Sequence, residues 1–183
     1  AEQLDGLVAS QPFVRHGVLL PELFAAGIPV FCEKPLAHSV EAGEHILKAL
    51  NQSAAGLFVG YHKRSDPATM YAKLCVEGWK TSGEAVGLRY VRITMPEGDW
   101  IASGFTHLVR TEEPVPELET DPPPAGMDEA TARHYDEFVN YYIHQINLMR
   151  HLLGEGYSVT YADPSGVMLA VQSESGIAGV IEM

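Results

Sequence analysis

Apolar residues follow two different patterns along this chain, and their order predicts how the first sixty residues fold. Short apolar runs at 4–9, 28–31 and 57–61 predict buried strands. Between these runs, apolar residues recur every three or four positions, which predicts a helix over 14–24 and a second helix capped by Ser39. Helical connections of this kind join parallel strands, so we expect a parallel sheet with covering helices.

The remainder of the chain predicts long helices and an antiparallel sheet. Asp66 before Pro67 marks a helix start, and Asp128 caps the longest helix, which stops at Gly154. Ser173-Glu174-Ser175-Gly176 predicts a hairpin-type turn, so the last strands are expected to pair antiparallel. The predicted elements are a helix through Met70, Leu74 and Trp79, a strand over 86–95, a helix over 128–153, and strands over 159–161, 167–172 and 177–183.

The stretch between residues 96 and 127 is irregular, with six prolines and many acidic residues. Its first half contains Trp100, Phe105 and His107, which we expect to pack against another part of the protein. A connection of this length is either functional or mobile, and composition leaves both possibilities open for the acidic part at 112–124.

Composition narrows the class of partner and the compartment. The 183 residues carry a formal charge of -12, and no window is rich in Lys or Arg, so nucleic acid and anionic membranes are excluded as expected partners. Two cysteines, Cys32 and Cys75, are too few for a disulfide framework and fit a reducing compartment. No apolar run reaches membrane-spanning length, so we expect a cytoplasmic protein. Strand-like runs at both ends of the sequence lead us to expect the middle of a longer protein.

The first candidate for chemistry is the tripeptide Glu33-Lys34-Pro35, which directly follows a predicted strand. Ligands of open α/β sheets bind beyond the carboxyl ends of the strands, so Lys34 can reach a substrate or cofactor there. The alternative is an ordinary surface ion pair. Cys32 lies inside the apolar run and is predicted to be a buried thiol, not a nucleophile.

The second candidate is a polar line on the longest predicted helix. Asn140, His144, Asn147 and His151 are spaced by four, three and four residues, which places them along one side of the helix. Other positions around this helix are apolar, so we expect most of it to be buried. The polar line is then a set of satisfied core groups, a line of solvent contact, or a line along which His144 faces a cleft. The expected apolar positions are Phe138, Val139, Tyr141, Tyr142, Ile143, Ile146, Leu148, Met149, Leu152 and Leu153.

Together these motifs resemble the Gfo/Idh/MocA family of NAD(P)-dependent oxidoreductases. The resemblance rests on the strand ending in Glu33-Lys34-Pro35 and on a downstream helix with His144 before the segment 148–154. It is also carried by Ser10-Gln11-Pro12 with His16, and by the segment Gly60-Tyr61-His62-Lys63-Arg64-Ser65-Asp66-Pro67. The likeness therefore covers most of the chain.

The resemblance implies a partial Rossmann-type parallel sheet in residues 1–63, followed by an α/β domain with a largely antiparallel sheet in residues 64–183. It implies a CH-OH dehydrogenase that uses NAD or NADP on a sugar or cyclitol-like polyol and forms homo-oligomers through the second sheet. Lys34 would lie between nicotinamide and substrate, and His144 would exchange the proton of the reacting hydroxyl. The implied cofactor contacts are Ser10, Gln11, Pro12, His16, Glu33 and Lys34, and the implied substrate contacts are Lys34, Tyr61, Lys63, Arg64 and His144.

The sequence departs from the family pattern in two places. It lacks the glycine-rich loop that holds the pyrophosphate, so these 183 residues are expected to bind cofactor poorly and to be inactive alone. Asn140 stands where the family commonly has Asp, and an amide can orient the imidazole of His144 but cannot stabilise its charged form. Asp136 lies about 12 Å further along the helix axis, too far from His144 to replace that carboxylate.

Other readings of the same residues are open. The chain could be a non-catalytic, cofactor-responsive binding or scaffold protein of the same architecture, a reading that Asn140 supports. A metal hydrolase using His62, His107 and His144 is a third possibility, although no adjacent ligand pair of the usual spacing anchors it, and we expect no metal. Arg64 could clamp the substrate or simply be a cation near the helix start at Asp66.

Overall fold

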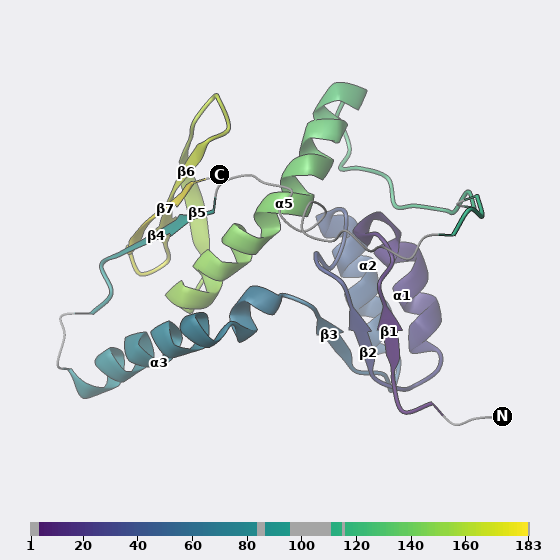
Figure 1. The fold of residues 1–183 in the computed structure, drawn as a ribbon, viewed down its shortest axis with the longest axis horizontal. Coiled ribbons are helices and arrows are strands. Elements are labelled where there is room, and N and C mark those ends of the chain that lie inside the picture. The colour runs from purple at the N-terminus through teal and green to yellow at the C-terminus, as the bar shows by residue number, and fades with distance from the viewer. Residues whose placement is uncertain (1–3, 84–86, 96–110, 115, 183) are drawn as a thin grey trace.

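The computed structural model describes residues 4–83, 87–95, 111–114 and 116–182, and these residues form two separate sheets. In Figure 1 the first sheet lies to the right with its two helices, and the second lies to the left. The long helix α5 (Glu129–Leu153) runs diagonally between them, and α3 (Pro67–Ser82) lies below the second sheet. This arrangement confirms the predicted fold class.

The first sheet consists of three short parallel strands in the order β1 (Leu7–Ala9), β2 (Val30–Cys32) and β3 (Leu57–Val59). The 3₁₀ turn η1 (Phe13–Arg15) and helix α1 (His16–Phe24) connect the first two strands, and α2 (Val40–Asn51) connects the last two. Ser39 caps α2 by accepting a hydrogen bond from the Ala42 amide, as predicted. Each strand is shorter than the apolar run that predicted it.

Both helices cover the same face of this sheet. Residues of that face form a core with the helices, and the core consists of Ala9, Leu20, Phe24, Val30, Cys32 and Ile46. Alternate strand residues point the other way, so Val8 is 77% exposed and Phe58 63% exposed. The expectation that the strands are buried was therefore wrong for one of their two faces. Leu47 on α2 is also exposed, although its neighbour Ile46 is fully buried.

The chain then passes through the 3₁₀ turn η2 (His62–Ser65) into α3. Asp66 caps α3 by accepting hydrogen bonds from the Ala68 and Thr69 amides, and Gly83 ends it with a left-handed φ of 70°. The predicted start is thus confirmed, and most of the apolar residues of α3 are exposed. Val76 is the residue of α3 that reaches the core, whereas Met70, Leu74 and Trp79 are exposed.

The second sheet has the strand order β4 (Tyr90–Thr94), β7 (Ala178–Glu182), β6 (Met168–Ser173) and β5 (Tyr157–Ala162). The β4–β7 pair is parallel and the other two pairs are antiparallel, which agrees with the predicted, largely antiparallel sheet. Helix α5 covers one face of it. The shared core consists of Val91, Ile93, Met149, Leu153, Val171 and Ile181.

Helix α5 is less buried than its composition predicted. Gln145, Met149 and Leu153 are its buried residues, and Tyr141 is exposed. The reason is that the amino-terminal half of α5 extends beyond the second sheet toward the first (Figure 1), where it meets fewer neighbours. The predicted packing contacts at Trp100, Phe105 and His107 lie outside the described residues.

His38 forms a joint between α5 and the first sheet. Its buried ring contacts the Asp136 carboxylate of α5 through Nε2 at 2.5 Å and the Asp121 carbonyl through Nδ1 at 3.0 Å. The Tyr135 hydroxyl donates to the His38 carbonyl at 2.7 Å. Asp121 also accepts a hydrogen bond from the Gly17 amide at 2.8 Å. The acidic stretch is therefore anchored at Asp121, and Asp136 serves this joint instead of His144.

Among the residues described, no helix combines the length and the apolar character that crossing a membrane requires.

Candidate functional site

Lys34 lies just beyond the carboxyl end of β2, as the sequence predicts for a ligand-facing position. The peptide bond between Lys34 and Pro35 is cis. The Lys34 backbone amide donates to the Glu33 carboxylate at 3.1 Å, which fixes the Glu33 side chain against the loop backbone. The loop therefore presents one cation and one anion at the sheet edge.

His16 holds this loop from behind. Its ring is fully buried, with Nδ1 3.0 Å from the Pro35 carbonyl and Nε2 3.2 Å from the Gln11 carbonyl. A residue placed in this way cannot touch a bound cofactor. We therefore revise its predicted role from cofactor contact to positioning: His16 fastens the loop after β1 to the loop after β2.

Lys34 bridges to helix α5 at Asn140. The Lys34 ammonium donates to the Asn140 backbone carbonyl at 2.8 Å and to its side-chain oxygen at 3.2 Å. The predicted catalytic residues Lys34 and Asn140 are thus brought together from positions 106 residues apart. The amide that was expected to orient His144 instead accepts from Lys34.

His144 lies one turn further along α5, with its ring against that of His62. The two ring centroids are 4.7 Å apart at an interplanar angle of 66°. Nδ1 of His144 is buried and has no hydrogen-bond partner among the residues described. Burial, followed by the positive charges of Lys34, His62 and Lys63, lowers the pKa of His144 from 6.5 to about 4. The ring is therefore neutral at neutral pH and able to accept a proton.

Burial and nearby charges also shift the pKa values of the neighbouring groups. Burial lowers the pKa of Lys34, and the nearby Glu33 carboxylate partly opposes that effect. Burial, then Lys63, lowers the pKa of His62, with a smaller opposing effect of Glu33. A region with this balance of charges favours a ligand oxygen that carries or develops negative charge.

The polar line of α5 continues away from Lys34 toward Arg64. The Arg64 Nε donates to the Asn147 side-chain oxygen at 2.6 Å, and its guanidinium lies 5.8 Å from the centre of the Tyr61 ring. His151 follows one turn later, and burial with the charges of Arg64 and Lys73 lowers its pKa. The polar residues of α5 are therefore neither uniform core nor plain solvent contacts, because each faces a basic side chain from the first half of the chain.

The predicted cofactor residues Ser10, Gln11 and Pro12 follow β1 and are exposed at the same sheet edge as Glu33. Exposed loops at the carboxyl ends of adjacent parallel strands fit one end of a dinucleotide, here the end near Lys34. The sequence has no Gly-x-Gly-x-x-Gly segment for the pyrophosphate, so this fit is partial. Cys32 is fully buried, and burial followed by Glu33 raises the pKa of its thiol to about 11, as expected for a structural cysteine.

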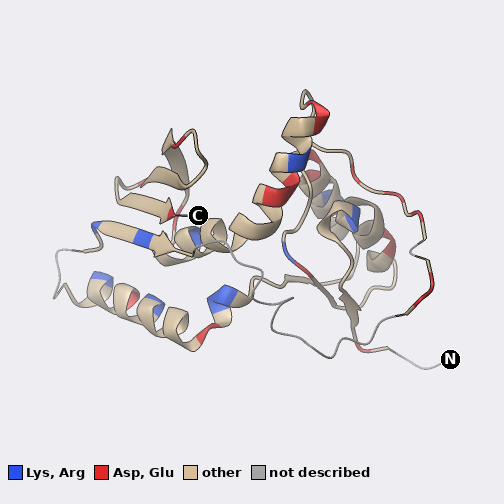
Figure 2. Ribbon diagram, turned by 45° about the horizontal axis from the view of Figure 1, so that its top comes forward, with Lys and Arg blue, Asp and Glu red and all other residues tan. Residues whose placement is uncertain are grey.

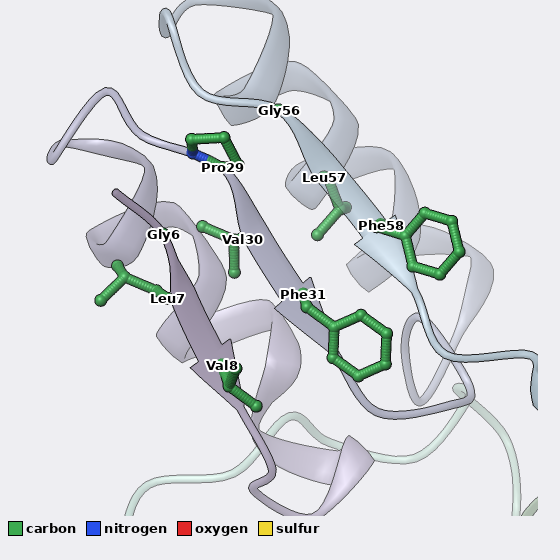
Figure 3. A pocket seen from close by; sticks show the side chains of 9 residues that line it. All are labelled: Gly6, Leu7, Val8, Pro29, Val30, Phe31, Gly56, Leu57 and Phe58. Carbon is green, nitrogen blue, oxygen red and sulfur yellow. The ribbon is translucent and has the colours of Figure 1, made fainter. Parts of the chain in front are cut away.

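The uncovered face of the first sheet carries a different hollow of about 410 Å³. Figure 3 shows Val8, Phe31 and Phe58 pointing away from the helices into this space. Its walls are apolar and contain no titratable side chain, and they include Gly6, Pro29 and Gly56 at the amino-terminal ends of the strands. It therefore lies on the wrong side of the sheet for the chemistry of Lys34 and His144.

The described residues contain no group of three His, Cys, Asp or Glu side chains able to hold a metal ion. His62 and His144 are adjacent, whereas His107, the third member of the hypothetical metal site, lies outside the described residues.

Sequence reasoning missed two parts of this site. The joint made by His38 depends on contacts across 83 and 98 residues, which no local pattern encodes. The partner of each polar residue on α5 was also unpredicted, although the spacing of Asn140, His144 and Asn147 was a usable signal that the line required partners.

Known proteins resemble this chain in sequence. Residues 5–61 match a family model described as "Oxidoreductase family, NAD-binding Rossmann fold". An inositol 2-dehydrogenase of Rhizobium meliloti is 31% identical over 77 residues, which are 42% of this chain and 23% of that protein. An uncharacterized oxidoreductase of Bacillus subtilis, YrbE, is 23% identical over 173 residues, which are 94% of this chain and 42% of that protein.

Solved structures share the fold. An oxidoreductase from Agrobacterium radiobacter, in complex with NAD+, L-tartaric acid and magnesium, superposes with a TM-score of 0.66 at 16% identity, and the match covers 100% of this chain and 48% of that one. A putative myo-inositol dehydrogenase from Sinorhizobium meliloti gives a TM-score of 0.63 at 20% identity, covering 100% of this chain and 51% of the other. The chain thus spans about half the length of these proteins or less.

Proposed function

We propose that this chain belongs to the Gfo/Idh/MocA family of NAD-binding oxidoreductases and forms the reacting end of a dehydrogenase acting on a polyol, a proposal supported by the family-model match over residues 5–61. The reaction is oxidation of a CH-OH group to a carbonyl, with a sugar or cyclitol as substrate. The observation that supports this most strongly is the meeting of Lys34 with α5 beside His144, at the carboxyl edge of the parallel sheet.

Lys34 and His144 have complementary tasks in this reaction. The neutral imidazole of His144 accepts the proton of the substrate hydroxyl. The Lys34 ammonium lies beside the oxygen while negative charge develops on it. The C–H bond breaks with its electron pair as the C=O bond forms, and NAD, when bound, supplies the acceptor for that hydride.

The remaining predicted residues surround this centre. Asn140 fixes the Lys34 ammonium through two hydrogen bonds, and His16 fixes the backbone of the loop that carries Lys34. Ser10, Gln11, Pro12 and Glu33 border the nicotinamide end of the cofactor. Tyr61, Lys63 and Arg64 line the approach of the substrate along α5.

A second function, cofactor-responsive binding without turnover, is favoured by one observation. A base with a pKa of about 4 matches neutral pH poorly, and no carboxylate stabilises the charged form of His144 among the residues described. In this alternative the cofactor binds and the polyol is not oxidised.

Turnover separates the two functions. The complete gene product is mixed with NAD+ and a panel of inositols and sugars, and reduced nicotinamide is followed by its absorbance. We expect substrate-dependent reduction that falls at least about a hundredfold in Lys34→Met, because the cation beside the reacting oxygen is lost. Lys48→Met, an exposed lysine at the end of α2, is the matched control and should retain activity. Equal activity in both variants would remove Lys34 from the mechanism.

A further inference from the structure

The carboxyl-terminal end of α5 borders a pocket that takes no part in the proton and hydride transfer described above. It has a volume of about 270 Å³ and is lined by Arg64, Lys73, Arg150, His151, Gly154 and Glu155. Three of the twelve Lys and Arg residues of a protein with a formal charge of -12 therefore line one pocket. Figure 2 shows basic residues on η2, α3 and this end of α5, whereas acidic residues follow the connection on the opposite side of the molecule.

Not all of this charge is available to a ligand. Lys73 pairs with Glu77 at 2.7 Å, and the neighbouring Lys80 donates to the Leu153 carbonyl at the end of α5. Cations at this position also stabilise the carboxyl end of a helix, so these lysines have a structural explanation. Glu155 adds one negative charge to the rim, but its carboxylate accepts hydrogen bonds from the Ser175 amide and hydroxyl.

The two arginines differ from these lysines in lacking a carboxylate partner, although Arg150 lies in the last turn of α5 and also stabilises that helix end. Arg64 donates to the neutral amide of Asn147, and within the described residues no carboxylate pairs with it. Arg150 forms neither an ion pair nor a side-chain hydrogen bond anywhere in the part of the chain that the structure describes. Arg133, on the same helix, pairs with Glu129 at 2.6 Å instead. Guanidinium groups bind phosphate and carboxylate oxygens through two parallel hydrogen bonds, and here two of them converge on one pocket.

The pocket lies further along α5 than the proposed reaction centre, on the same polar line of the helix. Asn147, the partner of Arg64, lies about 4.5 Å further along the axis of α5 than His144, and His151 lies about 10 Å further. A six-carbon polyol together with its esterified phosphoryl group spans a distance of this order. We infer that the Arg64, Arg150 and His151 pocket is an anion subsite that binds a phosphoryl group carried by the polyol substrate.

This inference rests on the proposed function, since the phosphoryl group is placed on the substrate of that reaction. Two sources of the anion are possible, a phosphate ester of the substrate and free inorganic phosphate.

The test compares Arg150→Gln with Arg133→Gln in the complete gene product. Binding of inorganic phosphate and of inositol monophosphate is measured by calorimetry, which requires no turnover. We expect Arg150→Gln to weaken both at least about tenfold and Arg133→Gln to leave them unchanged, because the loss of one charge-assisted hydrogen bond is of this size. Equal binding by the two variants would overturn the subsite, whatever the enzyme does with polyols.

Kinetics then distinguish the source of the anion. With NAD+, inositol monophosphate should have a KM at least about tenfold lower than inositol, and Arg150→Gln should abolish that difference while changing the KM for inositol less than about twofold. Oxidation of inositol without any preference for the phosphate ester would overturn the subsite and leave the dehydrogenase intact. Arg150-dependent phosphate binding that fails to compete with inositol monophosphate would show a free-anion site and overturn the assignment to substrate.

Discussion

Replacing Lys34 by Met should raise the pKa of His144 by a predictable amount. The pKa is lowered from 6.5 to about 4, a total of about 2.5 units, and all four causes act in the same direction. Burial is the largest cause and Lys34 the second, so Lys34 cannot account for more than half of the total, or about 1.2 units. A like charge at close range has an effect of about this size.

Methionine is suited to this experiment because it keeps the length of the lysine stem and removes the charge. The pKa of His144 is read from the pH dependence of its imidazole signals in heteronuclear NMR spectra of the complete gene product. We expect a rise of roughly 0.5–1 unit in Lys34→Met, since removing a nearby cation favours the imidazolium form. Lys34→Arg keeps the charge and should leave the pKa in place, and Lys48→Met controls for loss of a distant lysine.

An unchanged or lower pKa in Lys34→Met would refute this reasoning. It would mean that the ammonium is too far from the ring or too well solvated to act on it, and that burial alone sets the basicity of His144. The acidic limb of the pH–rate profile for kcat/KM should move upward together with the NMR value, because both report the free enzyme.

Three further changes test the packing and the electrostatics. Gly179→Ala should lower the free energy of unfolding by about 1–3 kcal/mol in a denaturant titration. The added Cβ would lie 2.7 Å from Val171 Cγ2 and 2.9 Å from Met149 Cε. Gly78→Ala is the control, because Gly78 lies on α3 in open space and its replacement should be neutral or stabilising. His16→Ala should lower the free energy of unfolding by about 2 kcal/mol or more, because it leaves carbonyls inside the protein without their partner. The control His45→Ala, at an exposed position, should lower it little. Equal losses in the two variants would contradict the positioning role of His16. His144 takes up its proton near pH 6.5 in the unfolded chain but only near pH 4 in the folded chain. The free energy of unfolding should therefore be highest above pH 6.5 and fall toward pH 4. His144→Gln should flatten this pH dependence, and an identical pH dependence in the variant would contradict the lowered pKa.

Helix starts and the parallel pairing of the first sheet were predictable from the sequence because short-range patterns determine them. Ser39, Asp66 and Asp128 each accept hydrogen bonds from the amides that open their helices, and this capping depends on neighbours within three residues. The parallel order of β1, β2 and β3 follows from the helical connections between them.

Exposure was less predictable, because it depends on which distant segment covers a face. Val8 and Phe58 have the same apolar character as Val30, yet the helices cover only the face to which Val30 belongs. The same limit applies to α3, where Met70 and Leu74 are apolar yet exposed.

The candidate site was predictable in its residues but not in its contacts. The Glu33-Lys34-Pro35 motif and the polar line of α5 are local signals, and both were recognised. The bond from Lys34 to Asn140 joins residues 106 positions apart, so the expected pairing of Asn140 with His144 could be corrected only by the fold. His16 was assigned to the cofactor because sequence position does not reveal that its ring is turned into the interior.

Cofactor binding is the measurement that tests the central proposal most directly. NAD+ and NADP+ are titrated by calorimetry into the complete gene product and into the Lys34→Met variant. The proposal predicts saturable binding of at least one of the two dinucleotides to the unmodified protein. Absence of binding for both would contradict the dehydrogenase and the cofactor-responsive alternative together, and it would leave the meeting of Lys34 and His144 without a function.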